Sequence, residues 1–420
     1  MLPQERNDMT EKVEQRTRED KLSLGQFFTE EREVDFMLTL KRNQGRILEP
    51  SCGDGAFLKK LPGHTVALEI DELVAPEGSI VTDFLDYSEE NKFSSIIGNP
   101  PYVAHSRILE STKKKCESYE SWSGKTNLFV IFIEKSLNHL EEGGEIIFIV
   151  PSVFFKATSC KDLNNKMFSE GSVTDLVLYG DKSPFVDAAP EYETCIFRYQ
   201  KGDYSRKTQT YKYSVATKTI EKECIKSYYV GDNGITFFFE GDVDVSSLYR
   251  IGDYFDVKVG GASGMDSFFE DNFRGNKDFV FSRTRQTGET RRMIYEDEPT
   301  DWLKQNVVAL VERRIKSKWT HKDWWKWGRP QPAMDGRRFY VNGKTRVESP
   351  FFTHESDNYD GAVLAIFPKE EALDAERSAR AFNTVDWDMF SMKTGKRYHF
   401  KQRLLENCFL TKEQYEMCKK

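Results

Sequence analysis

Four residues, NPPY from Asn99 to Tyr102, follow the apolar run FSSIIG and carry groups that could hold a planar amine. The side-chain carbonyl of Asn99 and the backbone carbonyl of Pro100 can accept hydrogen bonds at one point, and Tyr102 offers a flat aromatic face. Two prolines also end a strand, because proline fixes φ and lacks an N–H. A simple strand-ending turn is therefore the competing interpretation. The neighbouring motifs must decide between this turn and an amine-binding site.

The chemistry that these atoms could support is attack by the exocyclic amine of a base on an electrophilic methyl group. Such an amine is a poor nucleophile because its lone pair is delocalised, and acceptors on both hydrogens favour the pyramidal transition state. Stacking on the tyrosine would add about 1 to 3 kcal/mol. A sulfonium methyl can be attacked directly, so no cysteine nucleophile is needed. The seven cysteines form no C-x-x-C pair, which favours a reducing compartment and predicts no structural metal.

A glycine-containing turn precedes this motif in the chain. Residues 49–57, EPSCGDGAF, contain Gly53 and Gly55, which allow a tight turn and close approach of a ligand to backbone N–H groups at the start of a helix. Their spacing fits neither G-x-G-x-x-G nor a phosphate-binding loop that ends in Gly-Lys-Ser/Thr. Alone, such a pair is often only a turn.

Two acidic strand ends follow the glycine turn. The run HTVALEID ends in Glu69 and Asp71, and SIVTDF ends in Asp83 and Phe84. In doubly wound α/β folds, an acidic residue at the end of the second strand binds the hydroxyls of a ribose. A carboxylate beside an aromatic side chain suits the amino group and the face of an adenine ring. Each carboxylate alone could simply be solvated. Their order and spacing favour a site for adenosine.

Strands and a helical segment must position these motifs. Short apolar runs that predict buried strands occupy residues 46–53, 64–71, 79–84, 93–100 and 144–151, and residues 125–144 have helical spacing with a Gly-Gly stop. Alternating strands and helices predict an α/β fold with a mostly parallel, doubly wound sheet. Ligands bind at the carboxyl ends of the strands in such sheets.

The length and composition set wider limits. A chain of 420 residues suggests two domains, and its texture changes after about residue 200. The first 20 residues are charged throughout, so they predict a polar arm and no signal peptide. No apolar run approaches the roughly 20 residues of a membrane span, so we expect a soluble, cytoplasmic protein.

Taken in order, these motifs resemble the gamma-class N6-adenine DNA methyltransferases of bacterial type II restriction-modification systems. The similarity covers residues 21 to about 200, from KLSLGQFFTEEREVDFML through LEPSCGDGAF, VALEID, VTDFLDY and NPPYV to SPFVDAAPEYETCIFRYQ. One departure is Glu30, which follows Thr29 where the class commonly has proline. The segment 251–269 resembles the opening of the target-recognition domain in a subset of these enzymes.

The resemblance implies a fold, a reaction and a set of site residues. It implies a Rossmann-like class I methyltransferase domain at residues 21–220 and an α+β target-recognition domain at 221–420. The reaction would transfer a methyl group from S-adenosyl-L-methionine to N6 of a flipped adenine in double-stranded DNA, protecting the site from a cognate nuclease. The cofactor-binding residues that the resemblance implies are Thr29, Glu49, Pro50, Ser51, Gly53, Gly55, Glu69, Ile70, Asp83 and Phe84. Catalysis and base capture fall to Asn99, Pro100, Pro101, Tyr102 and Phe185.

A basic, aromatic segment supports a DNA partner independently. Residues 311–346 hold eleven Lys and Arg against three Asp and Glu, a net charge of +8 within a chain of -7. Such a segment can contact phosphates and stack against bases, although a solvated helix followed by core tryptophans would look similar. The candidate DNA-binding residues are Arg313, Arg314, Lys316, Lys318, Arg337, Arg338, Lys344 and Arg346.

Other functions share the NPPY motif. Enzymes that methylate a glutamine side chain on release factors use it, as do methyltransferases that act on guanine N2 in ribosomal RNA. Both usually lack a second domain with a basic aromatic segment, so they rank behind DNA methylation. A specificity subunit without catalysis would have lost Asn99 or the glycine turn. We expect a monomer and, if a restriction endonuclease exists, a separate protein.

Overall fold

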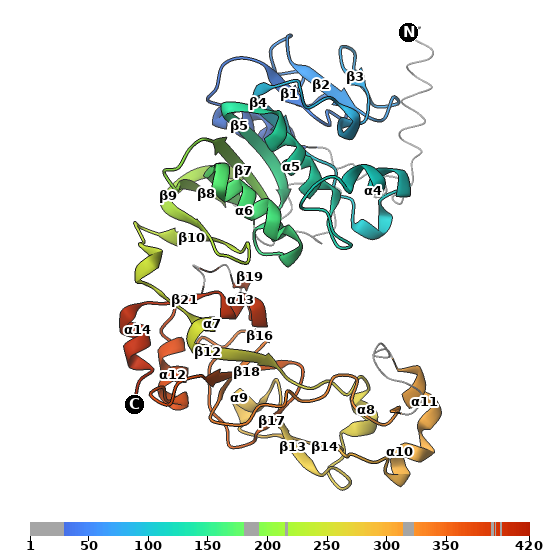
Figure 1. Ribbon diagram of the computed structural model, residues 1–420, viewed down its shortest axis with the longest axis vertical. Helices are drawn as coiled ribbons and strands as arrows, with labels where there is room; N and C mark the ends of the chain where they lie inside the picture. The colour runs from blue at the N-terminus through green and yellow to red at the C-terminus, as the bar shows by residue number, and fades with distance from the viewer. Residues whose placement is uncertain are drawn as a thin grey trace. The chain divides into compact units, whose positions relative to one another are not determined.

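The computed structural model describes residues 29–179, 193–214, 217–313, 323–387, 390, 392–394 and 397–420, and its chain divides into two compact units (Figure 1). Unit 1 is Met1–Val243 and unit 2 is Asp244–Lys420. The expected boundary at residue 220 falls inside strand β9 (Thr219–Val230), which pairs with β8 and β10 of the same sheet. Unit 1 therefore extends past that hairpin. The predicted polar arm, residues 1–20, lies outside the described residues.

Unit 1 is built on a ten-stranded sheet with the order β10-β9-β8-β6-β7-β5-β4-β1-β2-β3. The strands β1 to β5 and β6 are mutually parallel, while β7 is antiparallel to both β5 and β6. Their bounds are β1 Ile47–Glu49, β2 Val66–Glu69, β3 Ile80–Val81, β4 Phe93–Gly98, β5 Leu140–Pro151, β6 Gly171–Leu178, β7 Thr194–Lys201, β8 Lys207–Ser214 and β10 Thr236–Glu240. The predicted α/β sheet is confirmed, with a mixed extension beyond β5 in which β8 pairs in parallel with β6 and the other pairs are antiparallel.

Helices of unit 1 are α3 (Glu31–Leu40), α4 (Glu110–Cys116), α5 (Leu128–His139) and α6 (Lys161–Glu170). Helix α5 begins where the Asn127 side chain accepts a hydrogen bond from the Phe129 N–H, and nearly all its residues are buried because it packs against β5. The chain turns directly from His139 into β5, so the helix ends before the predicted Gly-Gly stop, which lies within β5.

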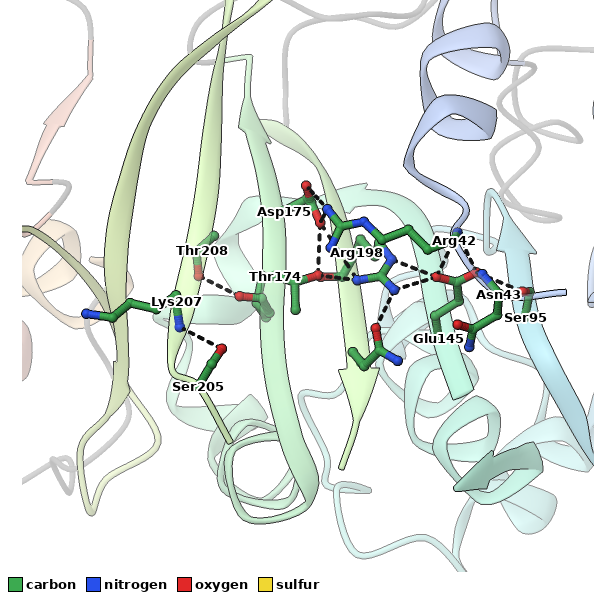
Figure 2. A network of polar contacts seen from close by, with 12 residues as sticks. Arg42, Asn43, Ser95, Glu145, Thr174, Asp175, Arg198, Ser205, Lys207 and Thr208 are labelled. Atoms are coloured by element: carbon green, nitrogen blue, oxygen red, sulfur yellow. Dashed lines mark hydrogen bonds and ion pairs between the residues drawn. The ribbon is translucent and has the colours of Figure 1, made fainter. Parts of the chain in front are cut away.

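A buried polar network crosses unit 1 near the beginning of β4 (Figure 2). The Arg198 guanidinium donates from Nε to Glu145 Oε2 at 2.7 Å and from Nη1 to the Thr174 hydroxyl at 2.6 Å. Glu145 also accepts the backbone N–H groups of Arg42 and Asn43, at 3.0 and 2.9 Å, and its neighbour in β4, Ser95, donates at 2.8 Å. The network therefore fastens the segment after α3 to the strands.

Unit 2 contains several small sheets, in agreement with the α+β expectation. Its three-stranded sheets have the orders β12-β18-β15, β14-β13-β17 and β16-β20-β19, and β11 pairs with β21. The strands are β11 Tyr249–Arg250, β12 Phe255–Val259, β13 Lys277–Val280, β14 Arg291–Met293, β15 Phe339–Asn342, β16 Lys344–Thr345, β17 Asn358–Tyr359, β18 Val363–Pro368, β19 Lys393–Thr394, β20 Arg397–His399 and β21 Phe409–Leu410. The helices are α7 Ile251–Tyr254, α8 Asp266–Phe269, α9 Thr284–Thr287, α10 Asp301–Gln305, α11 Val307–Glu312, α12 Ala375–Phe382, α13 Gln402–Glu406 and α14 Lys412–Met417.

Within the described ranges, no helix is both long enough and apolar enough to cross a membrane.

Candidate active site

A cavity of about 180 Å³ lies at the carboxyl ends of β1, β2 and β4. Its lining brings together most of the predicted site residues: Thr29, Glu49, Pro50, Ser51, Gly53, Glu69, Ile70, Asp83, Phe84, Asn99 and Pro101. Parallel strands end at the same edge of a sheet, which is why residues distant in sequence meet here. Gly55, Pro100 and Tyr102 do not line the cavity, and Phe185 lies outside the described residues.

The glycine turn after β1 is shaped by two left-handed residues. Gly53 has φ of +53° and Gly55 has φ of +78°, conformations that side chains disfavour. A Cβ atom on Gly55 would also stand 3.0 Å from Cγ of Pro76. The expected helix does not begin at these residues, because left-handed backbone cannot continue a right-handed helix; residues 53–60 instead form successive turns.

Glu69, at the end of β2, accepts two backbone hydrogen bonds. Its Oε2 accepts the Gly53 N–H at 2.8 Å and its Oε1 accepts the Asp71 N–H at 3.0 Å. Burial raises the pKa of this carboxyl, while the two backbone hydrogen bonds oppose the rise. The bonds fix the carboxylate at the cavity wall and still leave each oxygen able to accept another donor.

Glu49, at the end of β1, is a buried carboxyl whose partners are missing. Its residue is 1% exposed, and within the described part of the chain neither carboxyl oxygen has a hydrogen-bond partner. Burial raises the pKa of Glu49 well above its usual value, and the nearby Asp54 and Glu69 charges add to that rise, while the backbone N–H of Leu58 opposes it from beyond good hydrogen-bond geometry. Buried polar groups are normally satisfied, so this carboxyl fits a ligand that brings a donor or a positive charge into the cavity.

Asp83, the third acidic residue of the cavity to be described, lies just after β3. Its Oδ1 accepts the Leu85 N–H at 2.9 Å, and its Oδ2 accepts from Nζ of Lys115 at 2.7 Å. The same ammonium also donates to Asp86 Oδ2 at 2.6 Å, and these hydrogen bonds raise the pKa of Lys115. The carboxylate is thus held on two sides while it lines the cavity.

Apolar surfaces stand beside these polar groups. Ile70 is 61% exposed and Leu109 is 72% exposed, yet both line the cavity. Phe84 is buried, and its ring stacks on His139 at a centroid distance of 5.4 Å. Exposed apolar side chains at a cavity with carboxylate acceptors suit a ligand that has a flat ring and amino or hydroxyl donors.

Asn99 stands at the cavity with its backbone and side chain both held. Its Nδ2 lies 3.2 Å from Oγ1 of Thr29 and donates to it, and its carbonyl oxygen accepts from the Ser51 hydroxyl at 3.1 Å. With the amide nitrogen directed toward Thr29, the side-chain oxygen points away from that residue. The segment before α3, the glycine turn and the NPPY segment are therefore joined at one residue, Asn99.

Tyr102 does not offer the open aromatic face that its place in NPPY suggested. The residue is 6% exposed, its hydroxyl donates to the Ile149 carbonyl at 2.7 Å, and its ring meets Phe129 edge to face at 6.0 Å. The ring packs into the core beneath the strand ends because its hydroxyl finds a strand carbonyl of β5 as a partner. The expectation of a preformed stacking surface at Tyr102 is therefore corrected.

The basic segment of unit 2 is divided between core and surface. Arg313 is buried and donates to the carbonyls of Ser263 and Lys326, and Arg338 is buried between Gly336 and Asp357 carbonyls. These two arginines hold the fold, so their prediction as phosphate contacts is corrected. Arg337, Lys344 and Arg346 are exposed, and their contact with DNA stays a prediction. Arg314, Lys316 and Lys318 lie outside the described residues. The aromatic residues Trp327, Phe339 and Tyr340 are buried and belong to the core.

One wall of the cavity is formed by residues that no sequence motif singled out. Arg107, Ile108, Leu109 and Thr112, just before and within α4, line it, and Lys115 of the same helix binds Asp83. Their only signal was a short run of lysines, ESTKKKC, which looks like any solvated helix. Across the described residues, no group of three or more His, Cys, Asp or Glu could hold a metal ion.

A sheet whose strands β1 to β5 are parallel, with a cavity of acidic and apolar residues at their carboxyl ends, defines a Rossmann-like α/β domain. The solved structure of the Type IIL restriction-modification enzyme MmeI in complex with DNA resembles the chain with a TM-score of 0.60 and 12% identity. The likeness covers 96% of this chain and 65% of that one, and it confirms the predicted fold class.

Residues 55–185 match the model of the Eco57I restriction-modification methylase family. The chain is 36% identical over 193 residues to the Type II methyltransferase M.HincII of Haemophilus influenzae, covering 43% of this chain and 38% of that protein. It is 32% identical over 202 residues to M.TthHB8I of Thermus thermophilus, covering 43% and 46%. The chain spans less than half the length of these curated relatives. Residues 55–185 are therefore similar to this methylase family, which confirms the predicted resemblance.

Proposed function

We propose that this protein methylates the N6 amino group of adenine in double-stranded DNA, with S-adenosyl-L-methionine as the methyl donor. The observation that carries the proposal is the meeting of Asn99 with Glu49, Glu69 and Asp83 around one cavity. The matches to Type II methyltransferases support the reaction class.

The residues present fit the proposed cofactor. Glu69 would accept the ribose hydroxyls, Asp83 the amino group of the adenine, and Ile70 with Leu109 would contact the faces of its ring. The unsatisfied carboxyl of Glu49 would face the positively charged amino acid part of the molecule. When bound, S-adenosylmethionine supplies an electrophilic methyl group on a sulfonium.

Asn99 and Pro100 would act on the target base. The Asn99 side-chain oxygen and the Pro100 carbonyl would accept the two hydrogens of the adenine N6 amino group, which returns electron density to the nitrogen. Thr29 and Ser51 hold Asn99 in place before any substrate arrives, and such preorganisation is where most of the rate would come from. The adenine must leave the duplex to reach these acceptors, at a cost of a few kcal/mol.

Tyr102 would take part only after a local change. Because its ring is buried and its hydroxyl is bonded to Ile149, stacking on the target base would require the NPPY segment to move. In the observed conformation, the packing of the Tyr102 ring against Phe129 would instead stiffen the segment that carries Asn99. Phe185 stays a predicted second contact to the base.

Unit 2 would recognise the DNA. Its exposed Arg337, Lys344 and Arg346 would contact phosphates, which gives affinity with a strong dependence on salt and no sequence readout. In a restriction-modification system, methylation by this protein would protect the recognised site from a nuclease carried by another chain.

The test is product identification. Purified protein would be incubated with duplex DNA and S-adenosylmethionine labelled in its methyl group, and the DNA would be digested and its nucleosides separated by mass spectrometry. We expect N6-methyladenine as the labelled nucleoside. Label on another nucleoside, or on a glutamine-containing protein in preference to DNA, would reject the proposal in favour of the alternative NPPY reactions. Sequencing the modified DNA would then give the recognition site.

A further inference from the structure

Lys115 holds the acidic residue that the proposed function places against the cofactor's adenine. Its Nζ donates to Asp83 Oδ2 at 2.7 Å and to Asp86 Oδ2 at 2.6 Å, so one ammonium joins two carboxylates. The other Asp83 oxygen accepts the Leu85 N–H at 2.9 Å. The orientation of the Asp83 carboxylate is therefore fixed from both oxygens.

The side from which Lys115 approaches decides its role. Asp83 lines the cavity, whereas Lys115 and Asp86 are not among the described residues that line it. An ammonium inside the cavity would compete with a ligand for Asp83. One behind the carboxylate leaves the cavity-facing lone pairs available, because each carboxylate oxygen can accept two hydrogen bonds.

Charge explains why such a residue is needed. The Asp83 side chain is only 14% exposed, and a purine ring in the cavity would remove much of its remaining water. Lys115 supplies a countercharge that offsets this loss of water and holds the carboxylate in one orientation. A carboxylate held in this way accepts from a 6-amino group and repels the oxygen of a 6-oxo group.

We propose that Lys115 is a positioning residue that makes the cofactor site selective for a 6-aminopurine, by holding the Asp83 carboxylate turned as an acceptor toward the ring. This inference rests on the proposed function, since it takes the cofactor's adenine as the ligand of Asp83. It adds a residue on α4 that does not touch the ligand and acts only through Asp83.

The experiment compares two ligands that differ at one group. S-adenosylhomocysteine carries the 6-amino group, and S-inosylhomocysteine carries a 6-oxo group whose oxygen opposes the Asp83 acceptor. Calorimetry on the full chain should give at least about tenfold tighter binding of the amino ligand to the wild type, the effect of one hydrogen bond to a charged group.

Four variants separate positioning from general structure. In Lys115→Met the ratio of the two affinities should fall to within about threefold, and in Lys115→Gln, which keeps a donor without the charge, it should fall in the same direction. Lys115→Arg should keep the wild-type ratio. The matched control is Lys113→Met, on the same helix, where the lysine pairs with the surface residue Glu110 at 3.1 Å and with no other acidic group of the described residues. This variant should also keep the ratio.

The outcomes are distinguishable. If Lys115→Met and Lys115→Gln weaken both ligands equally and keep the wild-type ratio, Lys115 is only a structural contact and the inference is overturned. If the wild type binds the two ligands equally, the inference is overturned while a role for the cofactor stands. If the wild type binds neither, the proposed function falls, and the inference falls with it.

Discussion

Two buried glutamates in unit 1 show how differently one fold treats the same side chain. Glu145 of β5 is fully buried, and it is satisfied by Arg198, by the Ser95 hydroxyl and by the backbone N–H groups of Arg42 and Asn43. Glu49, at the end of β1, is just as buried and lacks such partners among the described residues. Glu145 stabilises the sheet near the beginning of β4, whereas Glu49 stands at the carboxyl edge where a ligand would complete it.

The comparison implies that stability and binding can be separated by mutation. A satisfied buried ion pair costs much to break, because its remaining partner is left charged and desolvated. An unsatisfied buried carboxyl costs stability while it remains, so removing its charge should help folding and harm binding. The changes below test this separation from the largest expected effect to the smallest.

Arg198→Met should produce the largest loss of stability. It leaves Glu145 without its cation, while Asp175 keeps Arg42, and we expect the free energy of unfolding to fall by about 3 to 5 kcal/mol in urea denaturation. The double variant Arg198→Met, Glu145→Leu should recover part of that loss, because no isolated charge remains. A loss below about 1 kcal/mol in the single variant would show that the network is not what holds the strands.

Glu49→Gln should behave in the opposite way. We expect equal or higher stability, together with cofactor affinity weaker by about 1 to 3 kcal/mol, the usual effect of a hydrogen bond to a charged group. The exposed Glu141→Gln should change neither quantity and serves as the matched control. If Glu49→Gln loses as much stability as Arg198→Met, the distinction between the two glutamates fails.

The pH dependence of stability adds a second test of Glu49. Its pKa is raised on folding, so the native state holds its proton more tightly than the unfolded state. The stability from this group is complete below the unfolded pKa of about 4.3 and is lost as the pH rises toward the folded pKa. Relative to Glu49→Gln, the wild type should therefore lose stability as the pH rises above about 4. Parallel pH profiles of the two proteins would contradict the raised pKa.

Arg337→Ala and Arg338→Ala should give small effects of different kinds. The exposed Arg337 should contribute to DNA affinity, so its removal should weaken binding several-fold and flatten the dependence of log K on log salt by about one unit. Buried Arg338 pairs with Asp357 at 3.0 Å, and its removal should lower stability without changing that slope. A flatter salt dependence in Arg338→Ala, with no change in Arg337→Ala, would instead assign Arg338 to the DNA-binding surface.

The sequence predicted the parts of the site that depend on the sheet alone. Glu49, Glu69, Asp83 and Asn99 each follow a short apolar run, and parallel strands carry such residues to one edge whatever the loops do. The sequence could not predict that Tyr102 turns into the core, because its partner Ile149 lies on another strand. Bonds of this kind depend on the distance between elements, which local patterns do not contain.

The same limit explains the basic residues. Arg313, Arg337 and Arg338 look alike in a charged segment, yet carbonyl groups brought close by distant loops bury two of them. Lys115 was missed for the converse reason, since a lysine on a short polar helix is ordinary until Asp83 is seen beside it. Composition located the basic segment, and only tertiary contacts separate its structural members from its surface members.

The central claim is that the Asn99 amide at the cavity holds a DNA adenine for methyl transfer, and Asn99→Ala tests it most directly. The rate of methyl transfer into duplex DNA would be measured with S-adenosylmethionine at saturation, beside calorimetric cofactor binding and a control, Asn233→Ala, in the turn before β10. We predict a loss of at least about 10²-fold in rate for Asn99→Ala, the effect of deleting one preorganised transition-state contact, with cofactor affinity and DNA affinity retained. Near-normal transfer of the methyl group to adenine by Asn99→Ala would contradict the account.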